Sequence, residues 1–469
     1  MTHLPCFYIM NSQFVSNDSI EKSKGGAAFM KPAYKVAGAS LLAISMLAGC
    51  GGSQGGDAGN GTGASGGNSG KKVTITYWQY SYPSKVTEIK KLIDEFQKQN
   101  PNIQVVEQDF PYDQYNQKVA AAMHAGKGPD ILNLYYGWIP QYVKEGYLQP
   151  IPEDFMSTQQ IDDYYIPMIQ DSKLDGKYYA LPIAVRSLAL FWNKDMFQKA
   201  GLNPDQPPKT WDELIKDAQK MTVYENGKLK QEGFAPDVQG QGYHVFEEVL
   251  LRQWGVTPFS DDHKKVQWNS SPQGLQAFQY WMDMFSKDKI GDPNFETDYE
   301  TAFKAGNCGM IIDGSFALGG FKQALKFNWG VAPLPTKEPG GTESNFGSYW
   351  VNGIAKGVSG DKLQAAEKFL KFLISEQTQK EWLQTVGELP AAKSLSSDPS
   401  ITGDPVYGPF VKGLQNAHAT YFVNETEERQ AIIDETNKIL LNHAPVDQVF
   451  NELVQKEQSI RDKYYSGQS

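Results

Sequence analysis

Segments with the pattern of strands and segments with the pattern of helices alternate along this chain from Lys71 onward, and this alternation limits the fold more than any other feature. Residues 73–78 (VTITYW) are typical of a buried strand. Ser84 is expected to cap the next helix, which Pro101 ends. The elements expected after it are a strand over 103–107, a helix over 113–125, a strand over 131–134 and a helix over 138–144. Elements in this order predict parallel βαβ units, a sheet covered on both faces and a protein of the α/β class.

The same pattern continues through the rest of the chain. Thr210 and Glu213 form a capping box that opens a helix. Tyr77 lies in a predicted strand and Trp211 in a predicted helix, and both are expected to be core residues. Tyr142 is expected to face inward. The other expected elements are an apolar run over 184–192, a strand over 310–312, and helices over 361–373 and 378–386.

Composition excludes several classes of function. The 469 residues include 44 Lys and Arg against 54 Asp and Glu, so the formal net charge is −10, and no nucleic-acid partner is expected. Three cysteines are too few for a disulfide framework or a Cys-rich zinc site. The six histidines form no HxxxH or HExxH pair, so neither a metal nor a cofactor is expected. Cys308 is expected to be a small buried residue.

The segment before residue 71 has the features of a targeting sequence. Residues 30–49 have a basic start followed by an apolar run over 36–48, which is too short to cross a bilayer and is typical of a signal peptide. The run ends in LAGC, which resembles the lipobox of bacterial lipoproteins. The resemblance implies cleavage before Cys50 and a lipid anchor, including palmitate, on that cysteine at the outer face of the membrane of a Gram-positive cell.

The remaining N-terminal residues divide into two parts. Residues 1–29 precede a complete signal peptide with its own methionine, so we expect Met30 to be the native start. Residues 50–70 comprise the lipidated cysteine and a Gly-rich tether with the composition of a flexible coil. Everything after Cys50 is expected to lie outside the cytoplasm.

Eight short stretches carry a resemblance that covers nearly all of residues 71–450. They are 96–105 (FQKQNPNIQV), 120–130 (AAAMHAGKGPD), 178–182 (YYALP), 191–201 (FWNKDMFQKAG), 208–214 (PKTWDEL), 302–315 (AFKAGNCGMIIDGS), 329–335 (WGVAPLP) and 387–391 (GELPA). In this order they resemble the family 1 extracellular solute-binding proteins, the maltose-binding-like receptors of ABC importers.

The resemblance implies a two-lobed periplasmic-binding-protein type II fold with a ligand cleft between the lobes. The first lobe would comprise residues 71–184 and 351–388, and the second would comprise 185–350 and 389–469. Hinge closure around the ligand would create the state that docks on the membrane permeases of the transporter. A separate ATPase would supply the energy, because this chain has no GxxxxGK[ST] loop. The receptor is expected to be a monomer.

Aromatic residues are the main candidates for a sugar site, because flat rings cover the apolar face of a sugar. Several of them lie where the family's ligand loops fall or at the ends of predicted strands. These candidates are Trp78, Tyr80, Tyr136, Trp138, Phe316, Tyr349, Trp350 and Tyr421. The alternative for each of them is a place in the core, since Trp and Tyr are usually largely buried.

The polar candidates for the rim of a sugar are Arg186, Glu247, Asp313 and Glu388. Arg186 lies where maltose binders carry a glutamate, and Tyr136 lies where many relatives carry an aspartate, so maltose specificity is not transferred. Arg186 has a competing role as an ion-pair partner between the lobes. Glu247 and Glu248 are neighbours on a predicted helix and form a poor catalytic pair, with one of them expected to face solvent.

The function favoured by these features is a lipid-anchored receptor for a carbohydrate, most simply an oligosaccharide. Relatives also bind glycerol phosphodiesters, which would require an anion site. A secreted glycan-active enzyme would need two carboxylates about 5–9.5 Å apart in the cleft, and no such pair is evident, so the chain is not expected to be an enzyme. A sensor or adhesin with the same fold is a third alternative.

Overall fold

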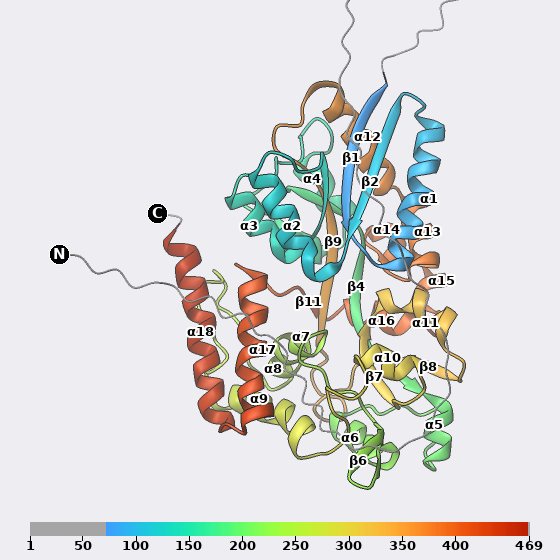
Figure 1. Cartoon of the computed structure of the whole chain (residues 1–469), viewed down its shortest axis with the longest axis vertical. Helices are drawn as coiled ribbons and strands as arrows, with labels where there is room; N and C mark the ends of the chain where they lie inside the picture. Colours follow the sequence, from blue (N-terminus) through green and yellow to red (C-terminus); the bar gives the residue numbers. More distant parts are fainter. Residues whose placement is uncertain (1–71, 468–469) are drawn as a thin grey trace, which may run out of the picture. The chain divides into compact units, whose positions relative to one another are not determined.

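A computed structural model describes residues 72–467 of the chain. The predictions for residues 1–29, for the signal peptide at 30–49 and for Cys50 and the tether at 50–70 lie outside the described residues. The described part is a mixed α/β structure (Figure 1). The predicted α/β class is therefore confirmed.

The strands form one large sheet and one separate hairpin. They are β1 (Val73–Tyr80), β2 (Ile103–Phe110), β3 (Ile131–Tyr135), β4 (Ala180–Asn193), β5 (Val223–Glu225), β6 (Lys228–Gln231), β7 (Met310–Gly314), β8 (Trp329–Ala332), β9 (Asn345–Ile354), β10 (Leu389–Pro390) and β11 (Ala417–His418).

The helices differ widely in length. They are α1 (Pro83–Gln99), α2 (Tyr112–His124), α3 (Ile139–Lys144), α4 (Thr158–Tyr164), α5 (Lys194–Lys199), α6 (Trp211–Met221), α7 (Gly242–His244), α8 (Leu251–Gln253), α9 (Pro272–Ser286), α10 (Tyr299–Lys304), α11 (Leu318–Ala324), α12 (Gly360–Leu373), α13 (Glu376–Thr385), α14 (Lys393–Ser396), α15 (Pro399–Thr402), α16 (Gly408–Leu414), α17 (Glu425–Asn442) and α18 (Val446–Ser466). Tight 3₁₀ turns occur at η1 (Tyr136–Trp138), η2 (Pro167–Ser172) and η4 (Ser315–Ala317), and a wider π-helical turn occurs at η3 (Val245–Leu250).

The first three strands form the parallel part of the sheet. β1 lies between β2 and β3 and runs parallel to both. α1 connects β1 to β2, and α2 connects β2 to β3, so the predicted βαβ units are confirmed here. Beyond β3 the sheet continues with antiparallel neighbours, in the order β10-β4-β9-β3-β1-β2.

Two long antiparallel strands, β4 and β9, connect this sheet to the later part of the chain. Residues 180–187 of β4 pair with 347–353 of β9, whereas residues 188–193 of β4 pair with β7 and β8. β9 in turn pairs with β3 near its end and with β11 near its start. Figure 1 shows both strands running through the middle of the described part. Every residue of β4 and β9 is buried, which explains the continuous apolar run in the sequence.

The sheet is covered on both faces, as predicted. On one face, Ile75 and Tyr77 of β1 belong to a core formed with α1 and α12. On the other face, Leu132 and Leu134 of β3 belong to a core that includes residues of α2 and α3. Tyr77 and Tyr142 are buried in these cores, and Trp211 and Cys308 are also buried, so all four predictions of core positions are confirmed.

Most predicted elements are present, and two of their details are informative. The capping box at Thr210 and Glu213 is formed as predicted. The start of α1 differs, because its N-cap is Tyr82, whose side chain makes no cap hydrogen bond, and Pro83 takes a first-turn position. Proline suits that position because its fixed φ is already helical. The prediction that Ser84 caps this helix is therefore wrong.

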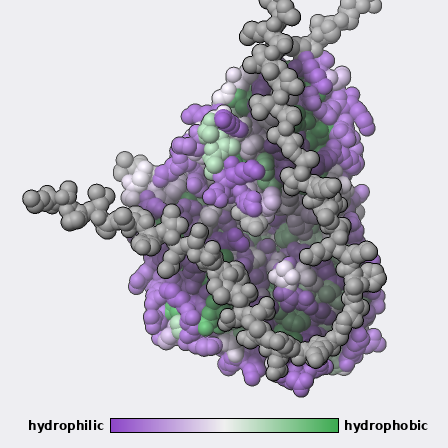
Figure 2. All heavy atoms as spheres, in the orientation of Figure 1, coloured by the Kyte–Doolittle hydropathy of each residue, from purple (hydrophilic) through white to green (hydrophobic). Residues whose placement is uncertain are grey.

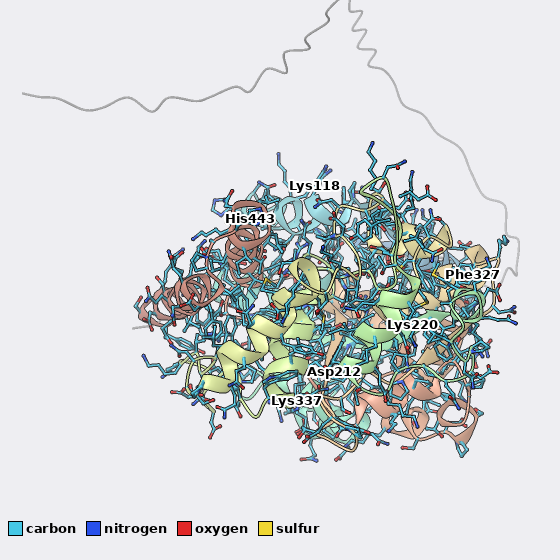
Figure 3. The ribbon with its side chains drawn as sticks, turned by 90° about the horizontal axis from the view of Figure 1, so that it is seen from below. Lys118, Asp212, Lys220, Phe327, Lys337 and His443 are labelled. Atoms are coloured by element: carbon cyan, nitrogen blue, oxygen red, sulfur yellow. The ribbon has the colours of Figure 1, made fainter. Side chains whose placement is uncertain are left out.

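The C-terminal helices α17 and α18 pack against each other and against α9 (Figures 1 and 3). His443 ends α17 with a left-handed backbone conformation, φ 55°, which turns the chain toward α18. The face shown in Figure 2 is mainly hydrophilic, with small hydrophobic patches between. Among the described residues, no helix has the length and apolar character needed to span a membrane.

Candidate functional site

A cavity of about 280 Å³ lies where the ends of β1 and β3 meet β4, β9 and several later segments. Carboxyl ends of parallel strands are the usual ligand-binding edge of an open α/β sheet. The residues that line the cavity are Tyr80, Ser81, Tyr82, Tyr112, Tyr135, Arg186, Gln239, Gly240, Gln241, Tyr243, His244, Tyr299, Glu300, Phe316, Phe346, Ser348, Trp350 and Arg429. Four predicted site residues are among them, namely Tyr80, Arg186, Phe316 and Trp350.

Aromatic rings form much of the wall of this cavity. Tyr80, at the end of β1, stacks on Trp350 of β9 with ring centroids 3.9 Å apart. Tyr112 meets the edge of Tyr80 at 5.7 Å, and Tyr82 meets the edge of Phe316 at 5.9 Å. Flat rings at different angles offer apolar faces and hydroxyl groups to the same ligand.

A buried charge cluster lies beside the aromatic wall. Glu388 forms ion pairs with Arg186 and with Lys85, whose Nζ lies 2.7 Å from Oε1, and Trp382 donates to its other oxygen at 2.7 Å. Arg186 also donates to the Tyr80 hydroxyl at 3.0 Å. Burial opposes ionisation of Glu388, but the two cations outweigh it and lower the pKa of this carboxyl to about 2. Arg186 therefore lines the cavity and also forms an ion pair with Glu388.

Burial and the nearby Arg186 both lower the pKa of Lys85. Together they lower the pKa of the Lys85 ammonium to about 7, although Glu388 partly offsets them. The guanidinium of Arg186 lies 4.8 Å from the centre of the Phe316 ring, which is a cation–π distance. The ion pair with Glu388 thus fixes the position of Arg186, which is the cation of this cluster that lines the cavity.

His244 brings an uncharged imidazole to the cavity. The side chain is 4% exposed and stacks on Phe346 with ring centroids 3.6 Å apart. Burial, together with the charge of Arg429, holds the pKa of His244 well below its usual value, so the ring is neutral. Its Nδ1 has no hydrogen-bond partner within residues 72–467. A buried polar atom without a partner is uncommon in a folded protein and calls for an explanation such as a bound water or ligand.

Arg429 and Glu300 are the other charged groups of the wall. The guanidinium of Arg429 donates from Nε and Nη2 to the Gln239 carbonyl, at 3.4 and 3.2 Å. Within the described part of the chain, no carboxylate lies within ion-pair distance of Arg429. Glu300 pairs with Lys304 at 2.5 Å. Glu300 is the one carboxylate among the described residues that line this cavity.

Two predicted residues lie behind the wall. Trp78, two residues before the end of β1, packs against Phe110 with ring centroids 4.9 Å apart. Trp138 donates from its indole nitrogen to Glu425 at 2.8 Å and meets Trp350 edge-on at 5.3 Å. Neither lines the cavity, and Trp138 supports the ring of Trp350 from behind.

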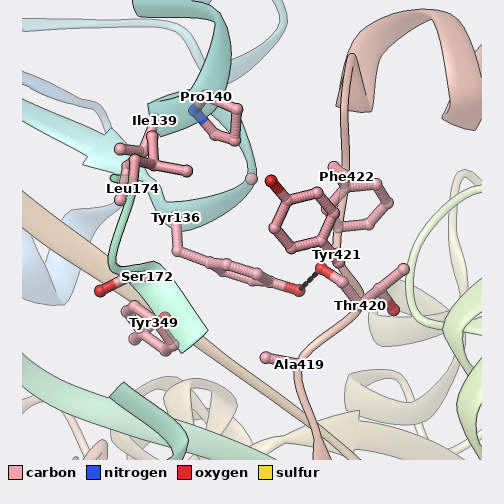
Figure 4. Close-up of a pocket in the computed structure, with 11 residues that line it drawn as sticks. Tyr136, Ile139, Pro140, Ser172, Leu174, Tyr349, Ala419, Thr420, Tyr421 and Phe422 are labelled. Carbon is pink, nitrogen blue, oxygen red and sulfur yellow. Dashed lines mark hydrogen bonds between the residues drawn. The ribbon is translucent and has the colours of Figure 1, made fainter. Parts of the chain in front are cut away.

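Three further predicted residues line a different and much smaller cavity, of about 30 Å³ (Figure 4). Tyr136 stacks on Tyr349 at 4.7 Å and donates to the Thr420 carbonyl at 3.1 Å, and Tyr421 lies on the opposite side. A space of this size holds water rather than a sugar. The structure therefore places Tyr136, Tyr349 and Tyr421 away from the larger cavity.

Strand geometry explains this division. Successive side chains of a strand point to opposite faces, so Tyr349 and Trp350 of β9 cannot both reach the same cavity. β3 extends one residue beyond its predicted end, to Tyr135, which lines the larger cavity. Tyr136 then begins the η1 turn and points to the smaller one.

The remaining carboxylates among the candidates are also outside the cavity wall. Asp313 accepts a hydrogen bond from the Tyr299 hydroxyl at 3.3 Å, and Tyr299 itself lines the cavity. Glu388 acts through Arg186. Burial raises the pKa of Asp313 well above its usual value, and the nearby Glu300 adds to this effect. Both predicted residues therefore support lining residues without lining the cavity themselves.

Glu247 belongs to a separate buried cluster. It lies on η3 and is 1% exposed, as is Glu248, so the prediction that one of the two faces solvent is wrong. Glu248 accepts from Arg252 at 2.8 Å and from Thr420 at 2.8 Å. The wider π-helical turn places both carboxylates inside the protein, where an ordinary amphipathic helix would expose one of them.

Several lining residues were not predicted. Tyr82 and Tyr112 each lie two residues after a strand end, of β1 and β2 respectively, so strand-end position is a signal that could have found them. Tyr243, His244 and Arg429 carry no such signal, because they come from segments brought to the cavity by tertiary structure. No group of three or more residues suited to hold a metal ion occurs within residues 72–467.

Comparison with known proteins identifies the family of this chain. A family model described as bacterial extracellular solute-binding protein matches residues 91–408. The chain therefore belongs to the bacterial extracellular solute-binding proteins, and the resemblance noted in the sequence is confirmed.

Three proteins that are similar to this chain give more detail. The maltotriose-binding protein of Pyrococcus abyssi is 26% identical over 73% of this chain and 72% of its own length. The sn-glycerol-3-phosphate-binding periplasmic protein UgpB of Escherichia coli K12 is 25% identical over 78% of this chain and 80% of its own. The structure of an ABC transporter solute-binding protein from Thermotoga lettingae, bound with α-D-tagatose, has a TM-score of 0.73 and 24% identity, covering 83% of this chain and 100% of the other. The two-lobed solute-binding fold is thereby shown.

Proposed function

We propose that this protein is a receptor that binds a carbohydrate in the 280 Å³ cavity and delivers it to an ABC transporter. The observation that carries the proposal is the Tyr80–Trp350 wall beside Arg186 and His244. Rings suit the apolar face of a sugar, while a guanidinium and a neutral imidazole suit its hydroxyl groups. The maltotriose and tagatose named for two similar proteins support a sugar ligand.

We further propose that ligand binding closes two lobes, comprising residues 71–184 with 351–388 and residues 185–350 with 389–469. The cavity wall supports this division, because Tyr80 and Tyr82 come from the first set and Tyr299, Phe316 and Arg429 come from the second. A ligand that contacts both sets favours the closed arrangement. The closed form would dock on the transporter permeases as a monomer.

The location of the receptor is part of the same proposal. Cys50 would carry the lipid anchor, and the Gly-rich segment at 50–70 would connect it to the folded part. The receptor would then act at the outer face of the cell membrane of a Gram-positive bacterium. Mass spectrometry of the native protein tests this, because a diacylated N-terminal Cys50 is expected.

The decisive experiment for the ligand is calorimetry of the purified protein with a panel of mono- and oligosaccharides. Micromolar binding of at least one sugar is expected, with a change in tryptophan fluorescence because Trp350 lines the cavity. Hydrolysis of the bound glycan would point instead to an enzyme. The single lining carboxylate, Glu300, opposes that outcome, since glycosidases use two.

A second candidate ligand is a glycerol phosphate or its diester. Arg429 favours it, because a guanidinium without a carboxylate partner within residues 72–467 is suited to an anion. The similarity to a glycerol-3-phosphate-binding protein points the same way. Binding of sn-glycerol 3-phosphate, without binding of any sugar, would establish this candidate and overturn the carbohydrate proposal.

A further inference from the structure

A second and larger opening, an open groove of about 820 Å³, adjoins the cavity. Tyr224 of the β5–β6 hairpin and Leu441 of α17 lie on its wall. The loop over 289–298 and the segment over 235–240 complete it. The groove is about three times as large as the cavity and falls within the size range of small-molecule sites, about 300–1,000 Å³.

The groove and the cavity share part of their walls. Gln239, Gly240, Tyr299 and Arg429 line both of them. A ligand that contacts Tyr299 and Arg429 in the cavity therefore lies directly beside the groove. This shared wall links the groove to the proposed ligand site.

The loop that carries the shared residues Gln239 and Gly240 is held in a defined shape. The Asp237 carboxylate accepts hydrogen bonds from the backbone N–H groups of Gln239, Gly240 and Gly242, at 2.9, 2.7 and 3.1 Å. Arg429 donates to the Gln239 carbonyl from the other side. A preformed loop lowers the entropy cost of binding, so this wall is suited to hold a ligand.

Exposed apolar side chains concentrate around these two spaces. The described residues include four large hydrophobic side chains that are strongly exposed, and three of them line the groove or the cavity. Tyr224 and Leu441 are 48% and 66% exposed on the groove, and Tyr112 is 40% exposed on the cavity. The fourth, Val223, precedes Tyr224 and lines neither space. The groove therefore offers an aromatic ring and an aliphatic side chain that a ligand could cover.

The groove also carries polar groups that a hydroxylated ligand can contact. The carboxylates of Asp292 and Asp298 already accept hydrogen bonds from Asn294 and Thr301, at 2.8 and 2.7 Å. The side-chain amide of Asn437, on α17, makes no hydrogen bond to another described residue, so it is available to donate and accept. An aromatic ring, an aliphatic surface and a free amide together match the two faces of a sugar unit.

We propose that this groove binds the outer units of an oligosaccharide whose inner end occupies the cavity. The inference rests on the proposed carbohydrate function and defines its ligand class further, as a chain too long for the cavity alone. Tyr224 would stack on one of the outer units, and Asn437 would hydrogen-bond its hydroxyl groups. Affinity would then depend on chain length through residues that a mono- or disaccharide never reaches.

The test is calorimetry of the full protein with α-1,4-gluco-, β-1,4-gluco- and β-1,4-manno-oligosaccharides of two to six units. Affinity is expected to rise with length in the series that binds. Tyr224→Ala and Asn437→Ala should each weaken binding of the hexasaccharide about fivefold and leave the disaccharide unchanged. Tyr224→Phe should retain most of the affinity, because the ring remains.

Val223→Ala is the matched control, since Val223 is on the same hairpin with 40% exposure but lines neither space. It should leave binding of every length unchanged. If disaccharide and hexasaccharide bind equally well, or if Tyr224→Ala weakens both to the same extent, the groove does not bind the chain, although the receptor proposal stands. If no sugar of any length binds, the carbohydrate proposal fails and this inference fails with it.

Discussion

Tyrosine and tryptophan residues of this protein serve either the cavity or the core, and one step along a strand decides which. Trp350 reaches the cavity, whereas its neighbour Tyr349 stacks on Tyr136 in the interior. The same step separates Tyr135 from Tyr136. An aromatic residue near a predicted strand end is therefore a candidate whose role depends on an exact register.

Substitution of Tyr82 and of Tyr349 should separate these two roles. Tyr82→Ala removes a half-buried ring of the cavity wall, so ligand affinity should fall about fivefold to tenfold with little change in melting temperature. Tyr349→Ala removes a ring that is 1% exposed and should lower the free energy of unfolding by about 3–5 kcal/mol. Calorimetry and thermal denaturation of both variants check this. Equal effects of the two variants on affinity and on melting would contradict the assignment.

Three buried carboxylates near one guanidinium should make stability depend on pH. Arg461 pairs with Glu428 and Glu457, at 3.3 and 3.2 Å, and Glu247 lies near the same group. Burial, followed by repulsion between the carboxylates, raises the pKa of Glu247 and of Glu457 well above the usual value. A raised pKa means that the folded state holds protons that the unfolded state has released, so this stability is present at acidic pH and is lost as pH rises.

Glu247→Gln tests this dependence, because the amide is neutral at every pH. Between about pH 5 and about pH 8, the free energy of unfolding should decline less in the variant than in the parent protein. Denaturant titrations at both pH values measure the difference. Asp398→Asn is a suitable control, since the pKa of this exposed carboxyl is lowered by hydrogen bonds from Ser400. A parallel pH profile for Glu247→Gln and the parent would contradict the prediction.

At the scale of elements, helix starts illustrate what local sequence determines. The capping box of α6 formed where the sequence predicted it, with hydrogen bonds of 3.2 Å from the Glu213 and Thr210 backbone N–H groups to the reciprocal side chains. α1 began one residue before the predicted cap because Pro83 occupies its first turn. Local patterns are reliable where the partner groups lie within the same turn, as they do in a capping box.

Thr210→Ala should therefore destabilise the protein by about 1 kcal/mol, since the side-chain cap of α6 is lost. Ser359→Ala provides the control. Ser359 is the N-cap of α12 but makes no side-chain cap hydrogen bond, so its loss should change the free energy of unfolding by less than about 0.5 kcal/mol. Denaturant unfolding of the two variants compares them, and equal losses would contradict the role of the cap.

At the scale of the whole molecule, β4 and β9 are the elements that connect the parallel sheet to the later strands. The cavity lies beside them and takes its wall from segments before, between and after the two strands. Movement of the later part relative to the parallel sheet would therefore change the cavity directly. This arrangement suits the proposed hinge closure.

Energy transfer between two dyes should detect that closure. Lys118→Cys and Lys220→Cys place labels in the two proposed lobes, at exposed positions labelled in Figure 3. A chain that starts at residue 71 retains one native cysteine, Cys308, which is buried and should not react. Transfer efficiency should increase when a binding sugar is added. The pair Lys98→Cys and Lys118→Cys lies within one proposed lobe and should remain unchanged, and a rigid protein would show no change for either pair.

The sequence by itself determined the class of fold, the order of its elements and the family. Periodicity, caps and strand-like runs depend on neighbours in the chain, and the family motifs occur in a fixed order along it. Only the tertiary structure decided which side chains share the cavity. Tyr243, His244 and Arg429 line the same cavity as Tyr80 and Trp350 because segments far apart in sequence pack together, and strand register divides Tyr349 from Trp350. Such contacts depend on how elements pack, which no local pattern specifies.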